Sequence, residues 1–122
     1  MSWNLDNDRP IFVQIIEHLE YDIVSGLLPP GAKVPSVREL AADAAVNPNT
    51  MQRALSEMER LGLLRTERTS GRYVTDDKDM IISLKKDLAA ACVGGFIKQM
   101  KRLGLQKDEV VKLVKDNYEE ES

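Results

Sequence analysis

Two helix-start signals stand close together between Val34 and Leu55, and they constrain the fold more than any other feature of the sequence. At the first, the side chain of Ser36 can cap free backbone amides while Glu39, three residues later, reaches back to it. At the second, Asn47 can act as the cap and Pro48 fits the first helical position. A short break separates the two signals, so this stretch predicts two helices joined by a tight turn.

The second of these helices divides into an apolar face and a polar face. The apolar face follows at spacings of three and four and comprises Met51, Ala54, Leu55, Met58 and Leu61. At about 100° per residue the opposite face comprises Asn49, Gln52, Arg53, Ser56 and Arg60, with Thr50 at its edge. Such a face, beginning at a helix N-terminus that favours anions, suits the major groove of DNA. A solvated surface of any small helical bundle is the alternative that periodicity leaves open.

A basic hairpin is predicted directly after this helix. Gly62 stands where a helix end favours a left-handed residue. Two short runs, 63–67 and 72–75, flank a turn at 69–71 and carry Arg65, Arg68 and Arg72. The order helix, turn, helix, basic hairpin is typical of a winged helix, whose wing can reach a minor groove or phosphates.

These motifs together resemble the DNA-binding domain of the GntR family of bacterial transcription regulators. The matching segments are PIFVQI at 10–15, GLLPPG at 26–31, VPSVRELA at 34–41, VNPNTMQRAL at 46–55, ERLGLL at 59–64 and GRYV at 71–74. The Asn-Pro-Asn-Thr variant and the short tail are similar to the YtrA-like branch. The resemblance implies a winged helix-turn-helix that binds double-stranded operator DNA.

The resemblance also implies roles for single residues. Arg38 matches an arginine that contacts the operator from the first helix of the motif, and Gly71 matches the wing-tip glycine. The start of the recognition helix matches at Asn47, Asn49, Thr50 and Gln52. With the polar face and the basic hairpin, the candidate DNA-binding residues are Arg38, Asn47, Asn49, Thr50, Gln52, Arg53, Arg68, Gly71 and Arg72.

Two departures from the family pattern affect these roles. Many relatives carry an arginine where this chain has Pro48, so a bidentate contact to guanine is not expected there. The wing usually reads Arg-Gly-x-Gly, whereas Thr69 and Ser70 occupy the first glycine and the residue after it. The geometry of the wing contact is therefore left open.

Composition and charge limit the classes of protein to which this chain can belong. The chain has 122 residues, 43% of them hydrophobic and 30% charged, with one cysteine and no long apolar run. No signal peptide, transmembrane segment, disulfide or cysteine metal cluster is expected, and the cytoplasm is the expected location. The formal net charge is −3, which is unusual for a DNA-binding protein, so we expect weak non-specific binding and reliance on a dimer.

The N-terminal part is predicted to support the motif. Pro10 opens a helix with an apolar face that comprises Phe12, Ile15, Ile16, Leu19 and Ile23. His18 lies away from that face and is interpreted as an ordinary surface residue. Trp3 and Leu5 alternate with polar residues, and we expect a short strand or an apolar clip that packs against the domain.

Residues 76–122 are predicted to be a dimerisation tail that follows the DNA-binding domain of residues 1–75. A hinge leads to a long helix from Met80 to Leu103, and a final helix starts near Asp108. Two helices of this size cannot bury a core of their own, so their apolar stripes need a partner. The candidate dimerisation residues are Leu84, Leu88, Ala91, Cys92, Gly95, Phe96, Met100, Val110 and Val114. Packing of these helices on their own winged helix is the alternative.

The overall fold class predicted is mainly α, with a small β-hairpin wing and a two-helix C-terminal segment. The predicted function is a homodimeric, sequence-specific DNA-binding regulator that represses a nearby operon; the family resemblance implies transporter genes there. The acidic charge favours the alternative, a winged-helix module that binds protein or RNA. The sequence shows no Ser-His-Asp set and no Gly-rich phosphate loop, so neither an enzyme nor a cofactor is expected. A small-molecule effector is left unknown.

Overall fold

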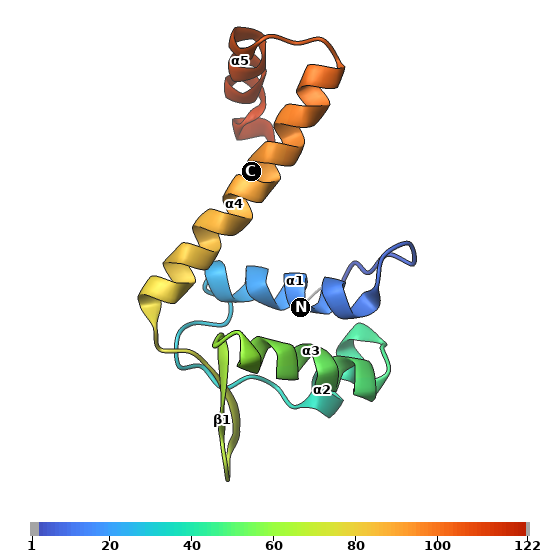
Figure 1. The fold of residues 1–122 in the computed structure, drawn as a ribbon, viewed down its shortest axis with the longest axis vertical. Coiled ribbons are helices and arrows are strands. Elements are labelled where there is room, and N and C mark those ends of the chain that lie inside the picture. The colour runs from blue at the N-terminus through green and yellow to red at the C-terminus, as the bar shows by residue number, and fades with distance from the viewer. Residues whose placement is uncertain (1–2, 122) are drawn as a thin grey trace. The chain divides into compact units, whose positions relative to one another are not determined.

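The computed structural model describes residues 3–121, and this range is mainly helical with one β-hairpin (Figure 1). The elements in chain order are α1 (Ile11–Val24), α2 (Val37–Ala44), α3 (Pro48–Arg60), β1 (Leu64–Glu67), β2 (Gly71–Val74), α4 (Lys78–Arg102), α5 (Lys107–Asn117) and a 3-10 turn (Glu119–Glu121). The predicted fold class, a winged helix-turn-helix followed by two helices, is confirmed.

The chain forms two compact units, one ending at Lys85 and the other beginning at Lys86. The first turns of α4 therefore belong to the winged-helix unit, and the predicted boundary at residue 75 precedes the end of that unit. The physical reason is apolar packing: Ile81 is buried in the winged-helix core, and Met80 and Leu84 pack against it. Leu84, predicted for dimerisation, thus contributes to the core of the first unit.

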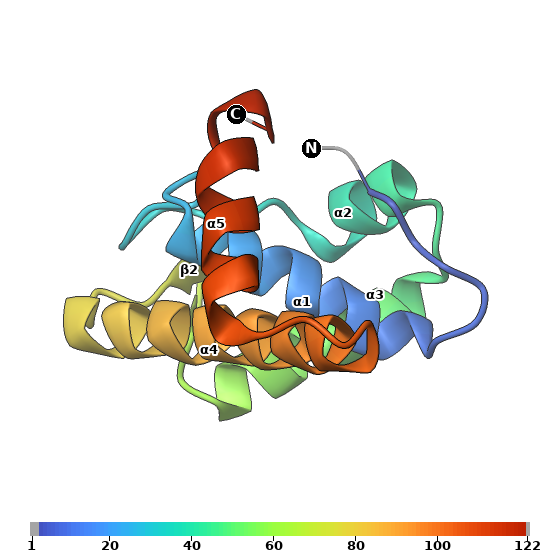
Figure 2. The same cartoon turned by 90° about the horizontal axis from the view of Figure 1, so that it is seen from above.

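The core of the first unit lies among its three helices and the hairpin. In Figures 1 and 2, α1 lies beside α3, and α2 packs against α3 to complete the helix-turn-helix. The fully buried side chains include Ile15, Leu19, Ile23, Leu40, Met51, Leu55, Met58 and Val74. Burial of one such side chain contributes roughly 1.5–3 kcal/mol, so this cluster holds the recognition helix in place.

Both predicted helix starts are confirmed. The Ser36 hydroxyl accepts from the Glu39 amide at 3.1 Å, and the Glu39 carboxylate accepts from the Ser36 amide at 3.2 Å. The Ser36 amide, followed by its hydroxyl, lowers the pKa of Glu39. The Asn47 side chain accepts from the Asn49 amide at 2.7 Å. Between the two helices, Ala45 adopts a left-handed conformation with φ 55°, which makes the turn tight.

The predicted apolar stripe of α3 is wrong at its last member. Leu61 is 44% exposed, whereas Met51, Ala54, Leu55 and Met58 are completely buried. The helix ends at Arg60, and Gly62 turns the chain away at φ 85°. Because the helical periodicity stops there, Leu61 no longer falls on the buried face.

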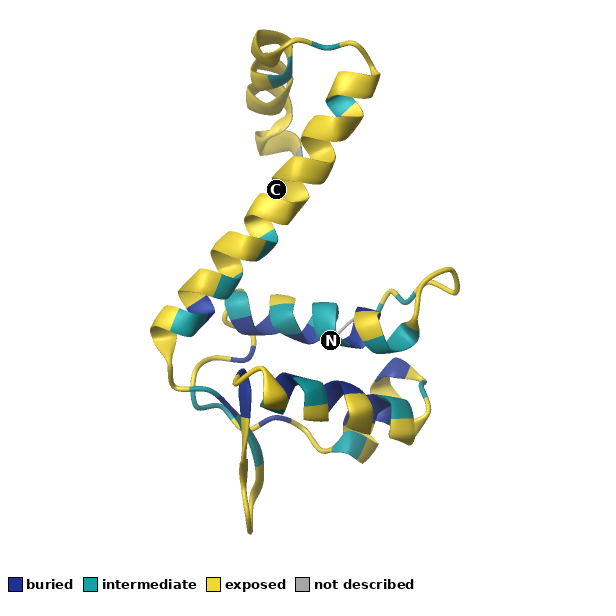
Figure 3. Ribbon diagram, viewed as in Figure 1, coloured by how far each residue is buried: buried dark blue, intermediate teal, exposed yellow. Residues whose placement is uncertain are grey.

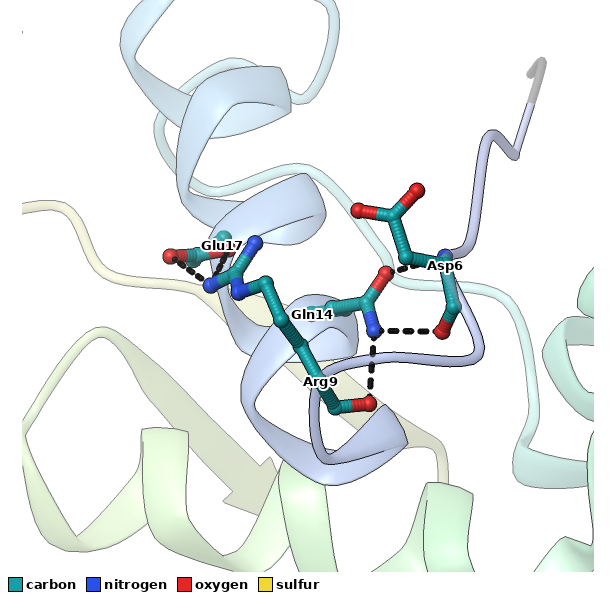
Figure 4. Close-up of polar contacts among 4 residues, drawn as sticks. All are labelled: Asp6, Arg9, Gln14 and Glu17. Carbon is teal, nitrogen blue, oxygen red and sulfur yellow. Dashed lines mark hydrogen bonds and ion pairs between the residues drawn. The ribbon is translucent and has the colours of Figure 1, made fainter.

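An N-terminal arm is fastened to α1 by a buried amide side chain (Figure 4). The Gln14 side chain accepts from the Asp6 amide at 2.6 Å and donates to the carbonyls of Asp6 and Arg9 at 2.8 and 2.9 Å. Arg9 also pairs with Glu17 at 2.7 Å. Residues 3–10 form no strand, so of the two predicted outcomes the apolar clip is the one observed.

The prediction for His18 is wrong, because this residue is covered by the arm. The Trp3 ring stacks on the imidazole with centroids 3.8 Å apart and an angle of 17° between the planes. On the same helix, His18 Nε2 lies 3.3 Å from Oδ2 of the buried Asp22. Trp3 therefore packs against the domain, as predicted.

The second unit contains the rest of α4 and all of α5. Gly104, with φ 83°, ends the long helix as predicted, and Gln106 caps the next one through Glu109. Among residues 86–120 none is buried (Figure 3). The expected absence of a separate core is thus confirmed for this part of the chain. No helix of residues 3–121 is both long and apolar enough to cross a membrane.

Candidate nucleic-acid interface

The outer face of α3 is polar and open to solvent. Asn49, Gln52, Arg53, Ser56 and Arg60 are exposed, and Thr50 is half-buried at the edge. In Figure 3 the buried residues of α3 lie on the side that faces α1, and exposed residues occupy other sides. The Gln52 amide donates to the Ser56 hydroxyl at 3.2 Å, so both side chains lie along the same face. This face can present donors and acceptors to base edges.

Two of the cations on α3 are engaged within the molecule. The Arg53 guanidinium lies 4.8 Å from the centroid of the Phe12 ring on α1. Arg60 donates to Glu57 one helical turn earlier, and that hydrogen bond lowers the pKa of Glu57. Of the two cations of α3, Arg60 is therefore paired with a carboxylate and Arg53 with an aromatic ring.

The wing contains a third extended segment that the sequence prediction missed. β1 and β2 pair antiparallel from Leu64 opposite Val74 to Glu67 opposite Gly71. The segment 32–34 pairs with the other edge of β2: the Val34 amide donates to the Arg72 carbonyl, and the Val74 amide donates to the Ala32 carbonyl, both at 2.9 Å. This additional pairing supports a hairpin that would be marginal alone.

A groove of about 800 Å³ separates the start of α2 from the wing. It brings together three of the predicted residues, Arg38, Gly71 and Arg72, although they are far apart in the sequence. Its further lining includes Lys33, Ser36, Thr66 and Ser70. Hydroxyls and cations of this kind are the groups that bind phosphate oxygens of DNA.

Lys33 is the cation of this groove that was not among the predicted DNA-binding residues, although the sequence left open a phosphate contact or a solvated side chain for it. Its side chain runs along the wing, and a Cβ built on Gly71 would lie 3.4 Å from Lys33 Cε. The sequence signal was an extended Ala-Lys-Val stretch before Pro35. The partner of that stretch, Tyr73, is distant in the chain, so the pairing was not visible from local pattern.

The three arginines of the hairpin have different environments. Arg65 pairs with Glu67 and Asp76, and its guanidinium lies 5.2 Å from the Tyr73 ring centroid. Arg72 pairs with Glu59 of α3. Arg68 is exposed at the turn and forms no ion pair within residues 3–121. Arg68 is therefore the hairpin arginine whose charge is available to a phosphate.

Part of the predicted dimerisation set lines an apolar groove in the second unit. Phe96, Met100, Val110 and Val114 line it, between α4 and α5, and its volume is about 860 Å³. The same groove has Lys101, Lys107 and Lys115 in its lining. The predicted residues Leu88, Ala91, Cys92 and Gly95 lie on α4 outside the groove, Leu88 half-buried and the others exposed.

The described part of the chain contains no candidate metal-binding site. Within residues 3–121 no group of three or more His, Cys, Asp or Glu side chains is placed to hold a metal ion.

The sequence matches the family model of the bacterial regulatory proteins of the gntR family over residues 12–74. The chain belongs to the GntR family. It is 43% identical to the HTH-type transcriptional regulator YhcF of Bacillus subtilis over 94% of this chain and 95% of the relative. It is 41% identical to the HTH-type transcriptional repressor YtrA of B. subtilis over 58% of this chain and 55% of that protein. The predicted YtrA-like resemblance is confirmed, and the chain is a DNA-binding transcriptional regulator.

Solved structures agree in fold. A GntR family transcriptional regulator from Listeria monocytogenes superposes with a TM-score of 0.86 at 39% identity, covering 92% of this chain and 98% of that one. The AraR DNA-binding domain, solved in complex with operator ORE1, superposes with a TM-score of 0.53 at 25% identity, covering 62% of this chain and 94% of that domain. The second likeness covers a fold that binds operator DNA in that protein.

Proposed function

We propose that this GntR-family regulator acts in the cytoplasm as a homodimeric repressor that binds an inverted repeat in double-stranded operator DNA. The observation that carries the proposal is the exposed polar face of α3, which four buried apolar residues of the same helix hold against the core. A rigid helix of this kind can place Asn49, Thr50 and Gln52 against base edges in a major groove.

Phosphate contacts fix the register of the helix in this proposal. Arg38 at the start of α2 and Arg68 at the wing turn are exposed cations on two sides of the interface. Lys33 adds a third beside the groove. Such contacts position the protein on the duplex and carry no sequence information themselves, so specificity is left to α3.

Dimerisation provides the second half of the contact. The second unit exposes apolar side chains at Phe96, Val111 and Val114 and buries none of residues 86–120. Covering this apolar face with a second copy is the simplest way to remove it from water, and closed two-fold dimers match palindromic operators. Repression is supported by the relative YtrA, which is named a transcriptional repressor. The family resemblance favours transporter genes as the regulated operon.

Single substitutions on the interface test the proposal. We expect Arg38→Ala and Gln52→Ala each to weaken operator binding about tenfold, since one good base or phosphate contact contributes at this level. The probe is the duplex that the native protein enriches from a random-sequence pool, and gel-shift titration measures binding. Arg9→Ala, an exposed arginine on the arm, is the matched control and should bind as the native protein does. Native affinity in both interface variants would contradict the assignment.

A further inference from the structure

The ion pair between Arg72 and Glu59 links the wing to the recognition helix. Arg72 lies on β2, and its Nε donates to a carboxylate oxygen of Glu59 on the last turns of α3. The side chains are only 20% and 30% exposed. Within residues 3–121 no other ion pair joins α3 to the hairpin.

Arg72 differs from the other two arginines of the hairpin in its surroundings. Arg65, at 41% exposure, pairs with carboxylates of the hairpin and of the segment after it, and not with α3. Arg68 is exposed at the turn. At Arg72 the backbone carbonyl also accepts from the Val34 amide at 2.9 Å, so the residue is held at both its main chain and its side chain.

Glu59 engages Nε of Arg72, and a phosphate contact that drew the whole guanidinium away would break this pair. That exchange would strand a largely covered carboxylate without its partner and place its negative charge beside the phosphate, both of which are unfavourable. If the pair instead stays intact, its net charge is zero, and it displaces no counterion from DNA. The hairpin has two four-residue strands, and its main chain is already paired with residues 32–34, so the side-chain link to α3 adds a second constraint on its direction.

We propose that Glu59 and Arg72 form a strut that orients the wing relative to the recognition helix, so that Arg72 is a positioning residue and not a phosphate contact. This inference rests on operator binding as proposed above, and it revises the predicted role of Arg72. It makes Glu59, an acidic residue on the DNA-binding unit, favourable for DNA binding.

Salt-dependent affinity separates a strut from a phosphate contact. The variants are Glu59→Gln, Arg72→Gln and the double variant, with Arg68→Gln as the matched control. Dissociation constants for the duplex that the native protein selects are measured over a series of KCl concentrations. Arg68→Gln should lower the slope of log K against log salt by about 1, because one phosphate contact is lost.

For the strut, the double variant, which keeps the zero net charge of the native pair, should bind about tenfold more weakly at every salt concentration, with the native slope. The double variant should be no weaker than Arg72→Gln, because both remove the same interaction. Native affinity in the double variant, or a slope lowered by about 1 in the double variant, would overturn the inference, since the first shows that the pair positions nothing and the second that Arg72 was a phosphate contact.

Two further measurements separate loss of the ion pair from loss of folding. Circular dichroism melts show which variants are folded at the assay temperature. The double variant Glu59→Arg, Arg72→Glu restores an ion pair in reverse, and recovery of affinity over the single swaps supports the strut, whereas no recovery overturns it. Failure of the native protein to enrich any duplex would instead contradict the proposed function.

Discussion

At the scale of single residues, Asp22 is an acidic group in an unfavourable place. Its side chain is buried, and Oδ2 has no hydrogen-bond partner among the described atoms. Burial raises the pKa of Asp22, and the nearby His18 imidazole lowers it to a lesser extent. A folded-state pKa above the unfolded value means that the carboxyl favours folding only while it is protonated.

The neutral variant Asp22→Asn should therefore be more stable than the native protein at neutral pH. The native carboxyl contributes stability below its unfolded pKa, and this contribution is lost as pH rises through the raised folded pKa. The difference in free energy of unfolding between the two proteins should shrink as pH falls below about 4. Urea unfolding followed at several pH values measures it. Asp43→Asn, an exposed position on α2, is the control, and a destabilised Asp22→Asn at pH 7 would show that pairing with His18 dominates.

The sequence predicted residues whose signals are local and missed those whose partners are distant. Ser36, Glu39 and Asn47 act within one turn of their own helices, so their roles as caps could be predicted. The prediction for His18 was wrong because Trp3, which stacks on it, belongs to a separate segment of the chain. Glu59 was not singled out for the same reason, since its partner Arg72 lies on another element.

At the scale of elements, one amide side chain makes three of the hydrogen bonds that hold the N-terminal arm on α1. Gln14 is 5% exposed and bonds to the main chain of Asp6 and Arg9 (Figure 4). These bonds fix the arm at the start of α1, and the arm in turn covers His18. Helix α1 supports α3, so the arm belongs to the scaffold of the recognition helix.

Gln14→Ala should release the arm. Loss of three hydrogen bonds to main-chain groups costs about 2 kcal/mol in docking free energy. Trp3 is the one tryptophan of the sequence, so its emission reports directly on the arm, and it should shift to longer wavelength as the ring leaves His18. Asn4→Ala, at an exposed arm position, should leave the spectrum unchanged. An unshifted spectrum in Gln14→Ala would show that Trp3 stacking alone holds the arm.

The ends of helices could be predicted from the sequence where a glycine marks them. Gly62 and Gly104 adopt positive φ where the sequence predicts helix ends. The third extended segment of the wing was missed, because residues 32–34 are too few to show an alternating pattern. Its pairing with β2 joins segments that are far apart in the sequence, so no local pattern indicates it.

At the scale of the whole molecule, the two units differ in how they are stabilised. The winged-helix unit has a buried core that runs from Ile15 to Ile81. In the second unit no residue from 86 to 120 is buried, and an apolar groove of about 860 Å³ lies between its helices. Folded helices with no core of their own are marginal, so the dimer proposed above would stabilise the second unit.

Phe96→Glu should disrupt the proposed dimer. Phe96 is 37% exposed and lines the apolar groove, so a dimer that covers this face would have to bury the new charge. By light scattering we expect a dimer for the native protein, as proposed, and a monomer for Phe96→Glu at the same concentration.

The melting temperature offers a second measure, because dimers that fold and associate together melt at temperatures that rise with concentration. That dependence should be lost in Phe96→Glu, and affinity for a two-half-site duplex should fall at least tenfold while affinity for a single half-site stays native. Gln99→Glu adds the same charge on the same helix outside the groove and should remain dimeric. A dimeric Phe96→Glu with native affinity would place the interface on another face of the molecule.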